Sequence, residues 1–173
     1  ISNPSNVFYK FTIIDGWQEY QINNLISNKF KKNIKINYNE ILADTYNYRS
    51  TDTIDDIIKL MQKNKDQYFF DKSKNLLLKK YTENEIMTIA SLVEKEGLDY
   101  NDKRIIASVI FNRLNKKMKL QIDASTIFSI TQGKYKFEKK LLYKDLKNIN
   151  DFNTYYIKGL PPNPICFVSR KTI

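Results

Sequence analysis

The sequence predicts an α+β fold, in which a small β-α-β lobe precedes a larger mixed α+β lobe with a central helical hairpin. Apolar and polar residues alternate from 7 to 14, as they do in a half-buried strand. In the middle of the chain apolar residues recur at helical spacing, directly after capping-box sequences. No internal repeat is present. We place the boundary between the lobes near residue 75, which gives lobes of residues 1–75 and 76–173.

The first lobe is expected to run strand, helix, strand. Asp15-Gly16 supplies a turn after the first strand. The residues after Trp17 then show the spacing of one helical face, formed by Ile22, Leu25 and Ile26. Residues 33–38 alternate again, with Ile34 and Ile36 on one face, which predicts the second strand.

Capping boxes mark the start of two longer helices. Thr53 with Asp56 precedes a helix of about four turns, and Thr82 with Glu85 precedes a helix expected over 83–96, which Gly97 ends. The second member of the hairpin is expected to begin near residue 101 and to carry one apolar stripe, formed by Ile105, Ile106, Val109, Ile110 and Leu114. A short helix is expected over 125–130.

Composition limits the chemistry that the chain can perform. Its 173 residues, 42% of them hydrophobic, are enough for a packed core. With no histidine and one cysteine, Cys166, it lacks the commonest residue of zinc, haem and Ser-His-Asp sites and cannot form an intramolecular disulfide. The net charge of +10 favours an anionic partner, unless the many lysines only reflect a compositional bias. No stretch approaches the roughly 20 apolar residues of a membrane span, and a first residue Ile1 is compatible with a removed upstream segment.

Two carboxyl groups stand out in Glu94-Lys95-Glu96, at the end of the helix predicted over 83–96. A helical wheel centres the apolar face near Ile86 and Val93, with one glutamate on each side and Glu96 slightly nearer. A carboxyl group at the edge of a core loses solvation, which favours its protonated form, and a general acid needs that form near neutral pH. The alternative is that both glutamates are surface residues balanced by lysines such as Lys103.

Other polar residues lie in predicted loops or at element ends, as in a groove for a sugar polymer. They are Asp44-Thr45-Tyr46, Gln121 with Asp123, and Asn153-Thr154-Tyr155. The alternative for each is a turn or a cap. Arg113 lies near the apolar stripe of the second hairpin helix, where its aliphatic part would otherwise simply cover the core.

Several of these segments together resemble the signature of the endolytic murein transglycosylase, or YceG-like, family. The resemblance is most specific at Ala90-Ser91-Leu92-Val93-Glu94-Lys95-Glu96, and it continues in family order and spacing through 111–114, 118–123, 143–146, 152–155 and 159–165. Asp44-Thr45-Tyr46 matches an upstream motif of the family. Residues 11–25 resemble, less closely, its small LysM-like lobe.

This resemblance implies a lytic enzyme that cuts nascent peptidoglycan strands. One glutamic acid would protonate the glycosidic oxygen between MurNAc and GlcNAc and then take the proton of the MurNAc 6-hydroxyl, which attacks the anomeric carbon and leaves a 1,6-anhydro end. No metal or organic cofactor is implied. We favour Glu96 as this acid/base, with Glu94 as the second candidate. The resemblance assigns substrate positioning to Arg113, Gln121, Asp123, Asn153, Thr154 and Tyr155.

The family also implies a cellular location. Its members are anchored in the bacterial inner membrane by a single helix and face the periplasm, so we expect the anchor to lie outside this chain. Expected partners are glycan strands and peptidoglycan synthases, and no nucleic acid. The sequence departs from the family pattern at Ala124-Ser125, where Pro-Thr is usual, and at 166–169, where an Asn-Pro-Gly-like stretch is expected. It also ends at Ile173, before the family's closing segment, which leaves the activity of this chain open.

Three other functions are compatible with the sequence. A basic nucleic-acid-binding module would combine the net charge with 12 Tyr and 10 Phe as stacking surfaces, although the basic residues are spread along the chain. A non-catalytic peptidoglycan-binding domain would bind through the LysM-like lobe and use the rest as a scaffold. An aminodeoxychorismate lyase would need pyridoxal phosphate, for which the sequence has no glycine-rich phosphate cradle.

Overall fold

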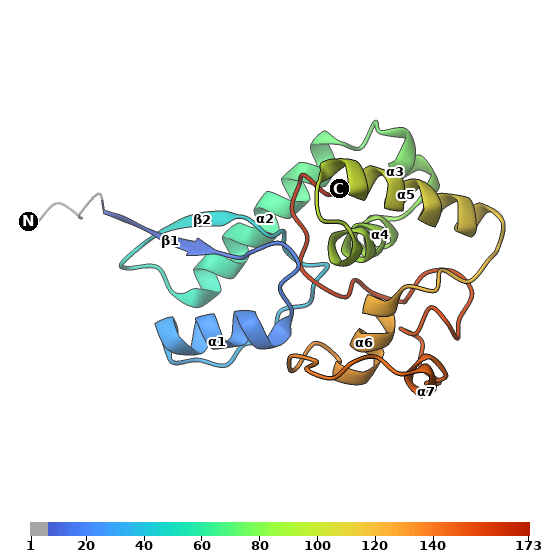
Figure 1. The fold of residues 1–173 in the computed structure, drawn as a ribbon. Helices are drawn as coiled ribbons and strands as arrows, with labels where there is room; N and C mark the ends of the chain where they lie inside the picture. The colour runs from blue at the N-terminus through green and yellow to red at the C-terminus, as the bar shows by residue number, and fades with distance from the viewer. Residues whose placement is uncertain (1–6) are drawn as a thin grey trace, which may run out of the picture.

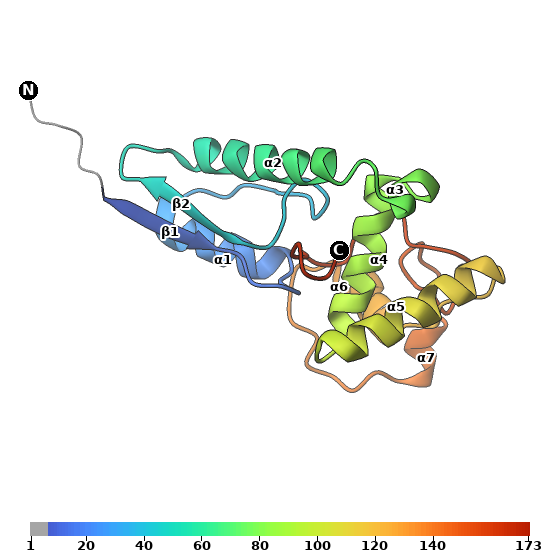
Figure 2. The same cartoon turned by 90° about the horizontal axis from the view of Figure 1, so that it is seen from above.

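In the computed structural model, residues 7–173 are described, and they form two strands and seven helices (Figure 1). The strands lie at one end of the molecule with the first two helices, and the remaining helices gather at the other end (Figure 2). The mixed α+β class predicted from the sequence is therefore confirmed. The boundary near residue 75 stays a prediction.

The strand end is a two-stranded antiparallel sheet covered by two helices. Strand β1 (Phe8–Thr12) pairs with β2 (Thr45–Arg49), and Phe11 lies opposite Tyr46. Helices α1 (Glu19–Phe30) and α2 (Ile54–Asp71) contribute further side chains to this core, including Ile22, Ile26, Ile57 and Met61. The predicted capping box of Thr53 and Asp56 is present at the start of α2.

The prediction of a second strand over 33–38 was wrong. These residues are neither helix nor strand, although Ile36 is buried. The pairing partner of β1 is instead β2, which begins at a segment predicted to be a loop. Alternation shows which side chains face the core, and an extended loop satisfies that pattern as well as a strand does. Which segment hydrogen-bonds to β1 depends on where the chain returns after α1.

The other end is built around α4 (Glu83–Glu96), which packs against α5 (Tyr100–Asn115) as the predicted hairpin. Every residue from 86 to 93 is buried, so α4 is surrounded by other segments along this length. The Thr82 and Glu85 capping box is present, and Gly97 follows the last helical residue as predicted. The shorter helices are α3 (Leu76–Lys80), α6 (Asp123–Thr131) and α7 (Tyr143–Leu146).

The apolar stripe of α5 is shifted around the helix from the predicted one. Its core-facing residues are Ile106, Ala107, Ile110, Phe111 and Leu114. Ile105 and Val109 face outward, with 64% and 44% of their surface exposed. Sequence periodicity shows that a helix has an apolar face, but neighbouring segments decide which residues at its edges are covered.

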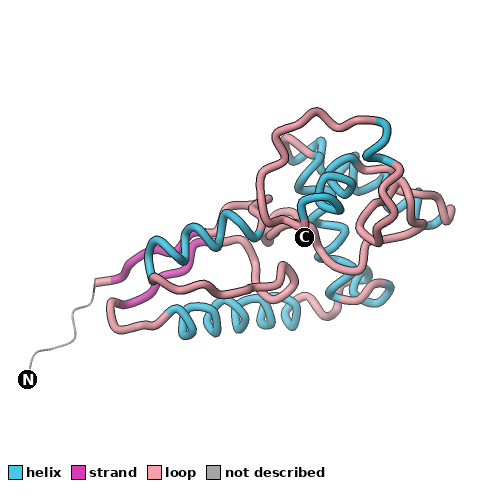
Figure 3. The backbone as a smooth tube through the Cα atoms, turned by 90° about the horizontal axis from the view of Figure 1, so that it is seen from below, coloured by secondary structure: helices cyan, strands magenta, loops and turns pink. Residues whose placement is uncertain are grey.

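The C-terminal segment joins the two ends of the molecule. From residue 147 onward the chain contains no helix or strand, as the tube in Figure 3 shows. The backbone NH of Gly16 donates to the carbonyl of Phe167 at 2.9 Å, and the NH of Phe167 donates to the carbonyl of Trp17 at 2.9 Å. Phe167 itself is fully buried in the core beneath the sheet. This segment therefore holds the Asp15-Gly16 turn against the helical end. Within residues 7–173 no helix is both long and apolar enough to span a membrane.

Candidate functional site

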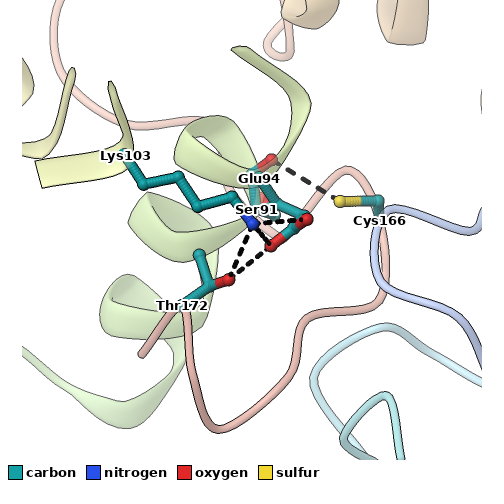
Figure 4. Close-up of polar contacts among 5 residues, drawn as sticks. All are labelled: Ser91, Glu94, Lys103, Cys166 and Thr172. Atoms are coloured by element: carbon teal, nitrogen blue, oxygen red, sulfur yellow. Dashed lines mark hydrogen bonds and ion pairs between the residues drawn. The ribbon is translucent and has the colours of Figure 1, made fainter. Parts of the chain in front are cut away.

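The two glutamates of the predicted motif stand where α4 leaves the core, and their surroundings differ. The Glu94 side chain is only 8% exposed, and the Lys103 Nζ donates to both of its carboxylate oxygens at 2.8 Å (Figure 4). The Thr172 hydroxyl, from the C-terminal segment, donates to the same carboxylate. Both donors come from segments that pack over the end of α4, so each Glu94 oxygen has a protein partner.

Glu96, by contrast, is exposed. The prediction that Glu96 lies nearer the apolar side than Glu94 was therefore wrong. A helical wheel assumes that one face of α4 is buried, whereas this helix is covered on all sides up to Val93. Beyond that point burial depends on which distant segments cross the helix end, and Lys103 and Thr172 cross it on the Glu94 side.

The Glu96 carboxylate lies beside the first turn of α6. Its Oε1 accepts a hydrogen bond from the backbone NH of Ala124 at 3.4 Å. The free NH groups at a helix start carry partial positive charge, which favours a carboxylate there. Asp123, at the first position of α6, is also exposed. Two carboxylates and a helix start thus share one open surface.

Tyr155 completes this surface. Its hydroxyl donates to Asp123 Oδ1 at 2.7 Å. That hydrogen bond, together with partial burial and the charges of Asp123 and Glu96, raises the pKa of Tyr155 to about 12, against an opposing effect of Arg113. Tyr155 is therefore a neutral phenol at physiological pH, and its hydrogen bond to Asp123 is the main cause of the raised pKa.

Two further predicted residues, Arg113 and Gln121, hold or belong to the segment that leads into this surface. The Arg113 guanidinium donates to the carbonyl of Leu120 and so holds the segment that leads from α5 to α6. Gln121 is exposed, has a left-handed backbone (φ 53°), and its NH donates to the carbonyl of Thr154 at 3.1 Å. The structure therefore brings Arg113, Gln121, Asp123 and Tyr155 together next to Glu96.

The side chains of Asn153 and Thr154 are not part of the exposed surface beside Glu96. Both are 0% exposed, so neither side chain lines a groove in this structure. The Thr154 hydroxyl accepts from the NH of Ile122 at 2.8 Å, and the Asn153 Oδ1 accepts from the Thr126 hydroxyl at 2.9 Å. They hold the start of α6 against the loop that carries Tyr155. The sequence pattern identified the loop but not the direction of its side chains.

Several other features lie away from Glu96. Asp44-Thr45-Tyr46 is at the start of β2, where the Tyr46 ring is buried and its hydroxyl donates to the carbonyl of Leu42. A cavity of about 450 Å³ lies where α1 and the loop after it meet α6, lined by residues that include Tyr38, Phe128 and Phe152 and exclude Glu96. The part of the chain that the structure describes contains no group of three His, Cys, Asp or Glu residues placed to hold a metal ion.

Sequence reasoning missed the partner of Glu94 from the C-terminal segment. Lys103 lies nine positions after Glu94 and was weighed as a balancing charge, but Thr172 lies 78 positions away. No local pattern links residues at that separation. Cys166 lies nearby, fully buried, and its thiol donates to the carbonyl of Ser91 at 3.5 Å (Figure 4). Burial raises the pKa of this thiol far above its usual range.

Comparisons with known proteins identify the family of this chain. A sequence model described as the YceG-like family matches residues 1–173. An endolytic murein transglycosylase from Bacillus subtilis (strain 168) is 39% identical over 138 residues, which cover 79% of this chain and 37% of the relative. One from Streptococcus pneumoniae serotype 2 (strain D39 / NCTC 7466) is 39% identical over 130 residues, 70% of this chain and 22% of the relative. This chain thus spans 37% and 22% of the lengths of these two relatives.

A solved structure extends the likeness to the fold. The crystal structure of a YceG-like protein from Listeria monocytogenes superposes with a TM-score of 0.79 at 25% sequence identity. The match covers 94% of this chain and 64% of that one. Because the family model spans the whole sequence and the same arrangement of helices recurs in a solved relative, the chain belongs to the YceG-like family.

Proposed function

We propose that this chain carries the catalytic centre of an endolytic murein transglycosylase, with Glu96 as its acid/base. The observation that carries the assignment is the contrast between the two glutamates. Glu94 is buried and its oxygens are engaged by Lys103 and Thr172, whereas the Glu96 carboxyl is exposed beside Asp123 and Tyr155. A group that exchanges protons with a polymer must be reachable by it.

The reaction needs only one carboxyl group and no cofactor. The Glu96 carboxylic acid gives its proton to the oxygen that links MurNAc to GlcNAc, and the bond from the anomeric carbon to that oxygen breaks. The carboxylate then takes the proton of the MurNAc 6-hydroxyl, and the oxygen of this hydroxyl bonds to the anomeric carbon. The product strand ends in 1,6-anhydroMurNAc, and Glu96 is protonated again.

The neighbours of Glu96 have distinct parts in this proposal. Tyr155 is a neutral phenol at physiological pH, and because its proton is donated to Asp123, its oxygen can accept a hydrogen bond from a sugar hydroxyl, while Asp123 accepts from others. Gln121 offers an exposed amide, and Arg113 fixes the segment that carries it. Asn153 and Thr154 hold the loop and do not touch the glycan.

The names of the relatives support the substrate class, because each is an endolytic murein transglycosylase. Since this chain matches only part of them, its activity belongs to the proposal. We further propose that the strand end acts as a LysM-like glycan-binding lobe, because residues 11–25, in β1 and α1, resemble such a lobe in sequence. From the same family resemblance we propose that the protein lies on the outer side of the bacterial inner membrane, held by an anchor outside these residues and working with peptidoglycan synthases.

The decisive experiment is cleavage of uncrosslinked glycan strands followed by mass spectrometry for anhydro-ended fragments. We expect Glu96→Gln to lower the turnover by at least about 100-fold, the usual contribution of a general acid/base. The matched control is Glu138→Gln, which removes an exposed carboxylate of the loop after α6 and is expected to leave turnover unchanged.

The possible results separate the candidate functions. An active Glu96→Gln protein would contradict the assignment of Glu96. Retention of glycan strands by the unmodified protein without any anhydro product would identify a peptidoglycan-binding domain instead of an enzyme.

A further inference from the structure

Four segments of the chain meet at the Glu94 side chain, more than a surface glutamate normally attracts. They are the end of α4 itself, the first turn of α5 through Lys103, the C-terminal segment through Thr172, and the Asp15-Gly16 turn. Figure 4 shows the ammonium group of Lys103 and the hydroxyl of Thr172 converging on one carboxylate. The Lys103 side chain is 22% exposed, so this ion pair is largely removed from water.

Lys103 also touches the end of α4 through its backbone. Gly97 directly follows the helix, and a Cβ at this position would come within 2.5 Å of the Lys103 Cγ and 3.2 Å of its Cα. The first turn of α5 therefore lies closer to the end of α4 than any other residue at 97 would allow. Lys103 thus contacts α4 and its end both at Glu94 and at Gly97, which precede and follow Glu96 in the sequence.

The Asp15-Gly16 turn approaches from the strand end of the molecule. A Cβ on Gly16 would be 3.8 Å from the Glu94 Cγ, in ordinary van der Waals contact, and the Lys95 Nζ donates to the carbonyl of Gly16 at 3.4 Å. The turn itself is held by its hydrogen bonds to Phe167. The last turn of α4 is thus fixed from three directions, although the ends of helices generally fray.

We propose that Glu94, with Lys103 and Thr172, is a positioning device that holds the last turn of α4 and thereby places the Glu96 carboxyl at the start of α6. The inference rests on the proposed function in that Glu96 is the group being placed. Glu94 does not contact the glycan, so it acts on catalysis only through the backbone two residues away. A displaced acid loses its alignment with the glycosidic oxygen, and a misplacement of about 1 Å can cost on the order of 100-fold in rate.

If Glu94 and Lys103 hold the last turn of α4, single and paired substitutions of these residues should differ in their effect on the stability of the fold. Removing one partner, as in Glu94→Gln or Lys103→Met, leaves a charge unpaired at a largely buried site and should destabilise the fold. Replacing both, as in the pair Glu94→Met and Lys103→Met, removes both charges and fills the site with similar volume, so the fold should remain stable. The paired variant therefore removes the tie without unfolding the protein.

The test combines two measurements on the paired variant, with the unmodified chain and Lys63→Met, an exposed lysine on α2, as controls. Native-state hydrogen exchange should be faster at the amides of residues 95–97, while the amides of 86–93 keep their protection. Glycan cleavage should show a kcat about tenfold lower with an unchanged KM. Lys103→Arg, which keeps the charge, should retain more turnover than Lys103→Met.

The outcomes separate this inference from the proposed function. Exchange at 95–97 equal to that of the unmodified chain would overturn the positioning role, whether or not the chain cleaves glycan. Faster exchange with an unchanged kcat would also overturn it. Absence of anhydro product from the unmodified chain would instead reject the proposed function, and the exchange data would still decide whether Glu94 holds the helix end.

Discussion

Glu94 and Glu96 are two residues apart on one helix, yet their carboxyl groups have different neighbours. Glu94 accepts from an ammonium group and a hydroxyl in a site that excludes most water. Glu96 accepts one long hydrogen bond from Ala124 and is otherwise open to solvent. At the scale of single residues, chemistry is decided by which donors reach a side chain, because each hydrogen bond from the protein leaves a carboxylate with one acceptor position fewer for a substrate.

Tyr155 provides a test of the surface around Glu96. Its raised pKa depends first on the hydrogen bond to Asp123, so we expect Asp123→Ala to bring that pKa down from about 12 toward the ordinary value of 10.0. Because the pKa of Tyr155 is higher in the folded than in the unfolded protein, its neutral phenol stabilises the fold below pH 10.0. This contribution is lost as pH rises through about 12. Titration of ¹³C-labelled tyrosine by NMR, with Tyr155→Phe to assign the signal, measures the shift. A pKa that is unchanged in Asp123→Ala would mean that burial is the cause.

The junction between α4 and α5 is the element on which the site depends. Only two residues, 98 and 99, separate Gly97 from the first residue of α5, and Asp99 caps that helix by accepting from the NH groups of Asn101 and Asp102. The tight turn forces α5 back along α4 at close range, which a side chain at position 97 would prevent. The hairpin thus positions Lys103 for Glu94 and leaves Glu96 on the outside.

Gly97→Ala tests this close approach. The added methyl group would overlap the Lys103 side chain and press on its backbone, while the Gly97 backbone itself is compatible with alanine. We expect a loss of about 1–3 kcal/mol in the free energy of unfolding, typical of an overpacked contact. Urea denaturation measures this loss, and Ser108→Ala on the exposed side of α5 serves as the control. A variant as stable as the unmodified protein would show that the hairpin can open without cost.

At the scale of the whole molecule, the C-terminal segment connects the strand end to the helical end. The segment that contains Phe167 passes between the sheet and α4, contributes to the core of the strand end, and then supplies Thr172 to Glu94. Asp15 lies beside this segment, and burial raises its pKa above the ordinary 3.8, with the Glu94 charge adding to the effect. A partly buried carboxyl group near Glu94 therefore lies between the strand end and the helical end of the molecule.

Asp15 makes the stability of the whole molecule depend on pH. Because its folded-state pKa is raised, its contribution is fully present below pH 3.8 and is lost as pH rises through the folded-state value. We expect Asp15→Asn, which cannot ionise, to lack this loss, so that its melting temperature relative to the unmodified protein rises with pH across that window. Thermal unfolding at a series of pH values measures the difference. A constant difference would show that Asp15 titrates as it does in the unfolded chain.

Much of the fold could be predicted because its signals are local. The capping boxes at Thr53 and Thr82 and the stop at Gly97 involve residues within one helical turn of each other, and each is present in the structure. The alternation in β1 likewise reports on adjacent residues. The partner of β1 could not be predicted, because pairing joins residues 33 to 41 positions apart and no local pattern selects among the extended segments.

The same distinction between local and long-range signals applies to the candidate site. The sequence by itself determined the α+β class, the hairpin, the family likeness and the loop residues that gather near Glu96. Only the tertiary structure decided that Glu94 is enclosed and Glu96 exposed, and that Asn153 and Thr154 point inward. The physical reason is that burial at a helix end or in a loop depends on segments that are distant in sequence, as Thr172 is from Glu94.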